Sequence, residues 1–270
     1  MSIIKEISQL LESVKVKKPL VHHITNYVTV NDCANMVLAL GGSPVMADDL
    51  AEVEEMVSFA SALVINIGTL NERTIQSMIT AGKKANQLGV PVILDPVGVG
   101  ATTLRTETTT KLLKEVRFAV VRGNMSEIKL ISGLNVQIKG VDSVADEENG
   151  VEIAKSLSAK LGAVVAITGA VDIVAEQEKV CKISNGDKLL ADVTGTGCMS
   201  TSLIGTYAGV TNDYFQAAIA GITTMGLSGE LAKKRLTEEQ AIGTFRVNLF
   251  DEVSKISVST LLDGGKVEWV

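Results

Sequence analysis

Short runs of apolar residues that end in polar positions recur through the first two thirds of the chain. Such runs occupy residues 62–67, 92–94, 118–121 and 163–167. They are followed directly by Gly68, Asp95, Arg122 and Thr168. Short apolar runs without polar alternation are typical of strands buried on both faces of a parallel sheet. The pattern therefore predicts buried strands whose carboxyl ends open into polar loops.

The segments between these runs repeat apolar residues at helical spacing. The spacing is visible in residues 70–88, 126–132 and 145–161, and again in the first 18 residues. Strands that alternate with helices form parallel sheets with right-handed crossovers. We therefore expect an α/β fold with a mostly parallel central sheet.

The pattern changes after Gly169. Residues 172–176 and 179–183 flank a short polar turn, which predicts an antiparallel hairpin at the edge of the sheet. Residues 198–255 are almost entirely helical in pattern, and residues 217–231 contain enough Ala and Gly for a closely packed internal helix. Because no linker or repeat divides the 270 residues, we expect a single domain over residues 1–270.

Composition and charge narrow the class of protein. The net charge is −6 without a basic run, which argues against nucleic acid or an anionic membrane surface as a partner. Cys33, Cys181 and Cys198 lack the spacing of a metal site, and their odd number is typical of reduced thiols. No segment resembles a signal peptide or a membrane span. We therefore expect a soluble, cytoplasmic protein.

Polar residues gather at the carboxyl ends of the expected strands, where open α/β sheets bind their ligands. Taken alone, Asp95 could be a turn residue, Arg122 a surface charge and Asn124 a helix cap. Together with Glu127 and Thr168 they would converge on one crevice. We therefore interpret the set as a binding site.

A glycine-rich turn at residues 192–198 leads into a small-residue helical segment. Glycines let backbone N–H groups face a ligand, and the start of a helix adds its positive dipole end. The turn is therefore predicted to bind an anion, with the Cys198 thiol in the first turn of the helix. A helix start lowers the pKa of a thiol, so a thiolate at Cys198 is one expectation.

These parts suit phosphoryl transfer. Asp95 and Glu127 can hold Mg²⁺, Arg122 and Thr168 can meet phosphate oxygens, and the amides of the turn can stabilise transferring charge. No Walker A motif with its lysine occurs, and the glycines near residue 100 do not complete a dinucleotide fingerprint. A P-loop enzyme or a Rossmann dehydrogenase is therefore disfavoured.

Two motifs resemble those of the ribokinase-like superfamily. Asn124, Met125, Ser126 and Glu127 match its Asn-x-x-Glu magnesium motif, and residues 194–198 match its Gly-x-Gly-Asp anion-hole motif with Cys198 in place of the aspartate. Residues 21–35 and 41–46 further resemble the hydroxyethylthiazole kinase family, and the likeness runs essentially from end to end.

The resemblance implies a three-layer αβα ribokinase-like fold. It also implies ATP-dependent phosphorylation of the primary alcohol of 4-methyl-5-(2-hydroxyethyl)thiazole, with Mg²⁺, in thiamine biosynthesis and salvage. The resemblance further implies a homotrimer whose thiazole pockets lie between subunits.

Residue roles follow from the same resemblance. The thiazole pocket would be formed by Asn26, Val28 and Met46, with Gly68 from the adjoining subunit and with Gly195 and Cys198 near the hydroxyl. The nucleotide would be bound by Arg122, Asn124, Thr168 and Thr194. Asp95 and Glu127 would serve Mg²⁺. The catalytic group would be Gly195, Thr196, Gly197 and Cys198.

Several alternatives remain open. Cys198 could be a general base, a residue that only shapes the pocket, or the nucleophile of a cysteine hydrolase with His22 or His23 as its base. On a strand, one of these histidines is expected to be packed and the other hydrogen bonded. A kinase for hydroxymethylpyrimidine or another small alcohol would need the same catalytic residues. A nucleotide-binding protein without activity would keep most of these residues.

Overall fold

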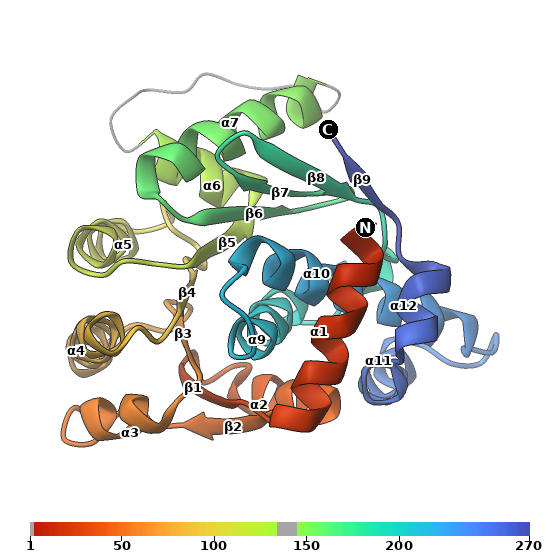
Figure 1. The fold of residues 1–270 in the computed structure, drawn as a ribbon, viewed down its shortest axis with the longest axis horizontal. Coiled ribbons are helices and arrows are strands. Elements are labelled where there is room, and N and C mark those ends of the chain that lie inside the picture. The colour runs from red at the N-terminus through yellow and green to blue at the C-terminus, as the bar shows by residue number, and fades with distance from the viewer. Residues whose placement is uncertain (1–2, 134–144) are drawn as a thin grey trace.

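The computed structural model describes residues 3–133 and 145–270. Their strands form one sheet in the order β2-β1-β3-β4-β5-β6-β7-β8-β9 (Figure 1). The parallel part of the sheet consists of β1 (Leu20–Ile24), β2 (Ser43–Met46), β3 (Ala62–Asn66), β4 (Val92–Asp95), β5 (Val120–Asn124) and β6 (Val164–Thr168). The antiparallel part consists of β7 (Asp172–Glu176), β8 (Lys179–Ile183) and β9 (Val267–Trp269).

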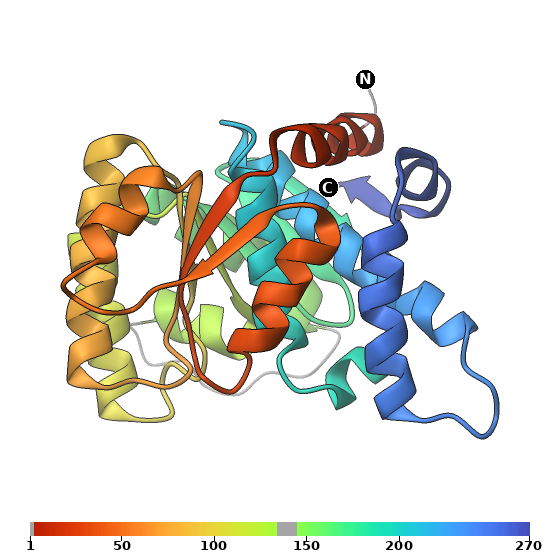
Figure 2. The same cartoon turned by 90° about the horizontal axis from the view of Figure 1, so that it is seen from below.

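Helices cover both faces of this sheet (Figures 1 and 2). One face carries α3 (Val53–Phe59), α4 (Glu72–Leu88), α5 (Thr103–Glu115), α6 (Met125–Ser132) and α7 (Ala145–Leu161). The other side carries α1 (Ile3–Lys17), α2 (Val30–Leu40), α8 (Leu189–Asp192), α9 (Thr196–Ala208), α10 (Tyr214–Lys234), α11 (Ile242–Lys255) and α12 (Val258–Gly264). The predicted three-layer α/β fold with a mostly parallel sheet is confirmed. Within the described ranges, no helix is long and apolar enough to cross a membrane.

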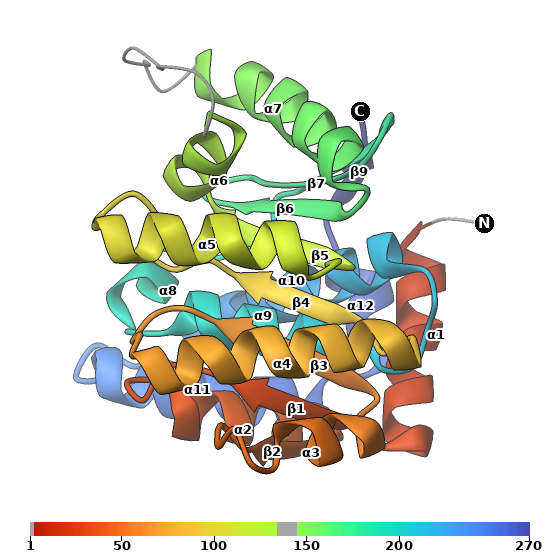
Figure 3. The same cartoon turned by 90° about the vertical axis from the view of Figure 1, so that its left-hand side faces the viewer.

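Two apolar cores lie on either side of the sheet, because successive strand residues point to opposite faces. In β3, Val64 belongs to the core that includes α9 and α10, whereas Leu63 and Ile65 belong to the core beneath α3–α7. Figure 3 shows α4 and α5 side by side over this second core. Both faces are therefore covered, as buried apolar strands require.

The helix α10 is packed closely, as its small residues predict. A Cβ atom at Gly221 would lie 2.7 Å from the backbone nitrogen of Ile204 in α9. The helix α9 in turn approaches the sheet at Gly205, where a Cβ atom would lie 2.6 Å from Val64 Cγ2. These contacts hold α9 tightly between α10 and the sheet.

The predicted antiparallel hairpin is confirmed as β7 and β8, and β9 extends the sheet beyond it. The pairing of β9 places Trp269 opposite Cys181, and the Trp269 ring stacks on Phe215 with centroids 5.7 Å apart. The hydrophobic pattern does not predict α5, because its sequence is rich in Thr and its buried residues are Thr108, Thr109 and Leu112. Too few apolar residues mark its buried face.

Candidate active site

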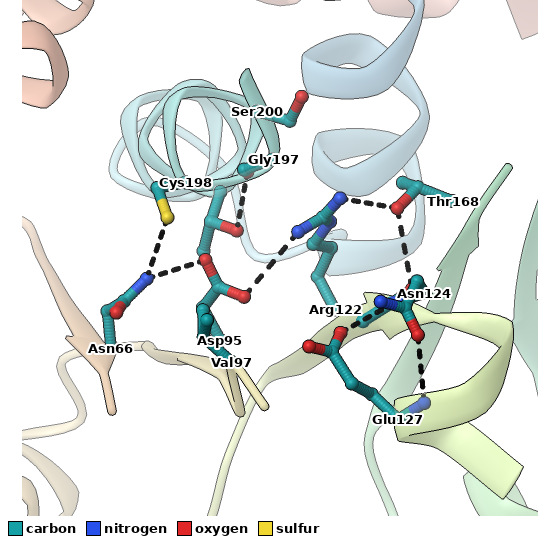
Figure 4. Close-up of polar contacts among 12 residues, drawn as sticks. Asn66, Asp95, Val97, Arg122, Asn124, Glu127, Thr168, Gly197, Cys198 and Ser200 are labelled. Carbon is teal, nitrogen blue, oxygen red and sulfur yellow. Dashed lines mark hydrogen bonds and ion pairs between the residues drawn. The ribbon is translucent and has the colours of Figure 1, made fainter. Parts of the chain in front are cut away.

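The polar ends of adjacent strands meet at one edge of the sheet (Figure 4). Asp95 ends β4 and pairs with Asn66 of β3, while Asn124 of β5 pairs with Thr168 of β6. Arg122 lies two residues before Asn124 on the same strand. The start of α9 faces these residues from the neighbouring layer. The convergence expected from the strand ends is therefore confirmed.

The first turn of α9 has free backbone donors. Gly195 is its N-cap residue with φ +88°, and no side chain caps the helix. The first backbone bond of the helix runs from Met199 N to Gly195 O, and no acceptor is found in the described chain for the N–H groups of Thr196, Gly197 and Cys198. Uncapped N–H groups at a helix start attract anions. The geometry supports an anion-binding turn.

Arg122 is fixed beside this turn. Its Nη1 lies 3.5 Å from Asp95 Oδ1, and its Nη2 donates a hydrogen bond to Thr168 Oγ1. A Cβ atom at Gly197 would lie 2.6 Å from Arg122 Nη1, so only glycine lets the guanidinium approach the helix start so closely. The Arg122 Nε atom is buried and has no partner among the described residues. A positive charge therefore lies next to the free N–H groups.

Asp95 is fully buried beneath this arginine. Its Oδ2 accepts a hydrogen bond from Asn66 Nδ2 at 2.7 Å. Burial raises the pKa of the Asp95 carboxyl, and the nearby charge of Arg122 partly offsets that rise. Removing the arginine would leave a buried carboxylate without a countercharge, which is costly.

The Cys198 thiol is held by two amides. Asn66 Nδ2 lies 3.2 Å and Asn26 Nδ2 lies 3.4 Å from Cys198 Sγ. Burial, and next the carboxylate of Asp95, raise the pKa of this thiol. A thiolate at Cys198 is therefore disfavoured, because desolvation and a neighbouring negative charge act against the helix start.

The histidines contact other groups. His22 Nε2 lies 2.7 Å from the carbonyl oxygen of Ala47, and His23 Nε2 lies 3.0 Å from Ser202 Oγ. His23 Nδ1 also lies 3.1 Å from the carbonyl oxygen of Val21. Both rings are thus hydrogen bonded, whereas only one was expected to be. No hydrogen bond joins either ring to Cys198 in the described part of the chain, so the thiol has no histidine base there.

Glu127 completes a capping box at the start of α6. Its Oε2 accepts a hydrogen bond from Asn124 N at 2.8 Å, and Asn124 Oδ1 accepts one from Glu127 N at 2.9 Å. The expected helix-cap role of Asn124 is confirmed. Glu127 Oε1 also accepts a hydrogen bond from Gly98 N at 2.8 Å. The carboxylate therefore joins two loops at the edge of the sheet.

Asp95 and Glu127 fit the donor set of Mg²⁺, which is usually bound by one or two carboxylates together with water and phosphate oxygens. Each Glu127 oxygen uses one lone pair on a backbone N–H and keeps another. Among the described residues, no three His, Cys, Asp or Glu side chains form a metal cluster. A protein-only metal cage is therefore not formed there, and phosphate would have to supply further ligands.

A cavity of about 770 Å³ opens from the anion-binding turn. Arg122, Asn124, Thr168, Thr196 and Gly197 lie at its polar end. Its apolar lining includes Leu190, Ala191, Ile222 and Met225. Thr194 is exposed and does not line the cavity. The polar end and the apolar lining match the phosphates and the base of a nucleotide.

Of the residues expected to bind the second substrate, Asn26 lies next to Cys198. Gly68 abuts Asn26, since a Cβ atom at residue 68 would lie 2.9 Å from Asn26 Cβ. Met46 ends β2 and is paired with His23 of β1. Val28 is 59% exposed. The structure thus brings Asn26, Gly68 and Cys198 of one chain together, so the expectation that Gly68 comes from the adjoining subunit is wrong. It leaves Val28 uncovered.

Sequence reasoning missed several residues at this edge. Asn66, Thr29, Arg105 and Asp172 all contact or line the site. Asn66 had a detectable signal, because it is a polar residue inside an otherwise apolar strand. Arg105 contacts Gly68 and Thr29 contacts Gly195, both distant in sequence, so no local pattern reveals them. Asp172 lines the site because β7 pairs with β6 at this edge of the sheet.

The fold is that of the ribokinase-like class of small-molecule kinases. A ribokinase-like superfamily protein from Enterococcus faecalis V583 has the same fold, with a TM-score of 0.66 at 14% identity over 95% of both chains. The hydroxyethylthiazole kinase family model matches residues 11–259, and the chain belongs to this family. It is 57% identical to the hydroxyethylthiazole kinase of Alkaliphilus oremlandii over 99% of both chains.

A solved relative supports the assignment. The hydroxyethylthiazole kinase structure from Pyrococcus horikoshii OT3 aligns with a TM-score of 0.90 and 38% identity, covering 98% of this chain and 99% of the other. The alignment covers nearly the whole chain, so it includes the strand ends, the turn before α9 and both helical layers. The resemblance drawn from the motifs is confirmed.

Proposed function

We propose that this protein transfers the γ-phosphoryl group of ATP to the primary alcohol of 4-methyl-5-(2-hydroxyethyl)thiazole, a step in thiamine biosynthesis and salvage. Family membership supports the activity. The observation that carries the proposal is the approach of Arg122 to the uncapped start of α9, at the polar end of the 770 Å³ cavity. Fixed donors at that point stabilise charge on a transferring phosphoryl group.

ATP would lie in this cavity with its phosphates toward Arg122 and Thr168. The N–H groups of residues 195–198 would form the anion hole, with Gly195, Thr196 and Gly197 contributing backbone only. Asn124 would contact the nucleotide from the cavity wall. Thr194 would contribute only through its backbone, because its side chain is exposed and lies outside the cavity.

Asp95 and Glu127 would hold Mg²⁺, partly through water. The ion would neutralise charge on the phosphate oxygens. Asp95 lies at the Arg122 side of the site, and Glu127 lies at the start of α6. Their separate hydrogen bonds to Asn66 and to Gly98 hold both carboxylates in place without a metal ion.

The thiazole alcohol would bind beside Asn26, Gly68 and Cys198, with Val28 and Met46 as apolar walls. Tyr27 and Val28 are 79% and 59% exposed although the adjacent Asn26 is buried. Exposed apolar residues next to a site mark a surface that another chain covers. This exposure supports pockets that lie between subunits, as in the homotrimer that the family resemblance implies. The buried free cysteines support a reducing cytoplasmic location.

In the reaction, the alcohol oxygen would attack the γ-phosphorus while the bond from phosphorus to the ADP oxygen breaks. The products are the thiazole phosphate ester, ADP and a proton. The transition state is loose, so the alcohol proton leaves late and a strong base is unnecessary. A neutral Cys198 thiol between two amide donors would orient the alcohol, a role consistent with its raised pKa.

A radiolabel assay tests the proposal. The purified protein is incubated with γ-labelled ATP and Mg²⁺ and either the thiazole alcohol or hydroxymethylpyrimidine, and ester and amide probes are tested separately. We expect label to appear in the thiazole phosphate, with little in the pyrimidine product and no probe hydrolysis. Preference for the pyrimidine would contradict the proposed substrate, and nucleotide binding without transfer would identify a protein that lacks activity.

A further inference from the structure

Arg105 belongs to α5, outside the residues that the motifs identify, yet its guanidinium reaches the edge of the sheet that carries the site. Its Nη2 donates a hydrogen bond to the carbonyl oxygen of Gly68 at 2.6 Å. Its Nη1 donates to the carbonyl oxygens of Val97 at 2.5 Å and Ile67 at 3.1 Å. One side chain thus binds the β3–α4 loop and the β4–α5 loop together.

The β3–α4 loop leads from Arg105 to the reacting end of the acceptor pocket. Gly68 N donates a hydrogen bond to Asn66 Oδ1 at 2.8 Å. The Nδ2 atom of the same Asn66 contacts Cys198 Sγ and Asp95 Oδ2 (Figure 4). Gly68 also abuts Asn26. The position of the Gly68 peptide therefore fixes which way the Asn66 amide faces.

The β4–α5 loop leads from Arg105 to the nucleotide side. Val97 is bound by Arg105, and the next residue, Gly98, donates its N–H to Glu127 Oε1. Gly98 has φ +69°, and a Cβ atom there would lie 3.2 Å from Arg105 Nη1. A side chain at position 98 would crowd the guanidinium and strain the backbone. The loop conformation therefore depends on this contact.

We propose that Arg105 is a positioning residue that holds the Gly68 wall of the acceptor pocket against the loop bound by Glu127. The role rests on the proposed function, because the acceptor pocket is assigned by it. A planar guanidinium can donate to three carbonyls in different directions, whereas the ammonium of lysine is a compact point charge on a flexible stem. Arg105 is therefore not replaceable by lysine in this role.

The test compares Arg105→Ala and Arg105→Lys with Arg117→Ala as the matched control. Arg117 is an exposed arginine whose Nη2 also donates to a backbone carbonyl, that of Asn86, at the opposite end of the strands. Initial rates are measured over a grid of thiazole alcohol and ATP concentrations. Because misplaced loops lose substrate alignment, we expect KM for the alcohol to rise about tenfold or more in both Arg105 variants, and KM for ATP to change less than about threefold.

Chemical rescue separates positioning from a general loss of structure. Ethylguanidinium at millimolar concentration should restore the KM of Arg105→Ala toward the original value and leave Arg117→Ala unchanged. An alcohol KM within twofold of the unmodified protein in Arg105→Ala would overturn the proposal. So would an increase that ethylguanidinium does not reverse.

Amide hydrogen exchange provides a readout that needs no activity. In Arg105→Ala, exchange at Gly68 and Gly98 should accelerate about tenfold or more, while the α9 core amides keep their protection. Unchanged exchange at both glycines would contradict the role even if the alcohol KM rose. If the unmodified protein failed to phosphorylate the thiazole alcohol, the proposed function would fail, and the exchange result would still decide whether Arg105 holds the two loops.

Discussion

The methyl group of Thr29 lies against the α-carbon of Gly195. A Cβ atom on residue 195 would be 2.3 Å from Thr29 Cγ2. Thr29 precedes α2, and both its backbone N–H and its Oγ1 donate to Asn26 Oδ1, at 3.0 and 3.1 Å. Gly195 opens α9 with φ +88°. This contact therefore joins the loop that carries Asn26 to the anion-binding turn.

Replacing Gly195 with alanine should disable the enzyme. The added methyl group would overlap Thr29, and the positive φ would strain a residue with a side chain. We expect kcat/KM to fall about 100-fold or more, because the N–H groups of the turn would move off the phosphoryl group. Steady-state kinetics with the thiazole alcohol measure this.

Gly162→Ala is the matched control for Gly195→Ala. Gly162 also has a positive φ, +62°, but nothing lies within 4 Å of its Cβ position, so only the backbone strain is reproduced. The double variant Thr29→Ser with Gly195→Ala removes the Thr29 methyl group and should recover part of the activity. Equal losses in Gly162→Ala and Gly195→Ala would show that the Thr29 contact does not matter.

Substitutions at Cys198 test its role. If the thiol only orients the alcohol, Cys198→Ala should reduce kcat by about tenfold or less, since general base assistance is not lost. Cys198→Asp supplies the carboxylate found at the corresponding position of the superfamily motif and should keep or raise kcat. Steady-state kinetics of both variants measure these effects, and an inactive Cys198→Asp enzyme would refute this interpretation.

Arg122→Gln should impair both activity and stability. The substitution removes the charge that faces the anion hole, so we expect kcat/KM to fall about 100-fold or more. It also leaves the buried Asp95 carboxylate unpaired, so the free energy of unfolding should fall by about 3 kcal/mol. Urea unfolding measures the second effect. Arg122→Gln combined with Asp95→Asn should regain stability and remain inactive, and a double variant no more stable than Arg122→Gln would rule out the charge pairing.

The buried carboxyl of Asp172 should make the stability of the protein depend on pH. The residue is buried in the wall of the cavity, and burial raises its pKa to about 7, partly offset by the hydrogen bond from Gly169 N. The folded state therefore retains a proton that the unfolded state loses near the ordinary aspartate pKa of 3.8. Linkage then requires this group to reduce the free energy of unfolding progressively as pH rises from about 4 to about 7, with no further change above.

Asp172→Asn should abolish that dependence. The variant should be more stable than the unmodified protein at pH 8, and the difference should shrink as pH falls and vanish only below the unfolded-state pKa of 3.8, where the carboxyl is protonated in both states. Thermal unfolding across this pH range measures it, with the exposed Asp192→Asn as the control. A stability difference that stays constant with pH would mean that Asp172 titrates as it does in water.

Local sequence determined most of the strands, several of the helices and part of the site. Strands bounded by polar residues placed Asp95, Arg122 and Thr168 at one edge, because all parallel strands end on the same side. The Asn124 and Glu127 capping box also follows from sequence alone, since both partners lie in the first turn of one helix.

Only the tertiary structure decided the surroundings of the Cys198 thiol and the alignment of the loops. Cys198 meets Asn66 from a strand 132 residues away, and the resulting burial sets a thiol pKa that the helix start by itself would have lowered. Arg105 and Thr29 bind segments far from them in sequence, so no local pattern marks them. The reason is physical: hydrophobic periodicity and caps act within a few residues, whereas desolvation, charge pairing and close contact depend on which distant segments pack together.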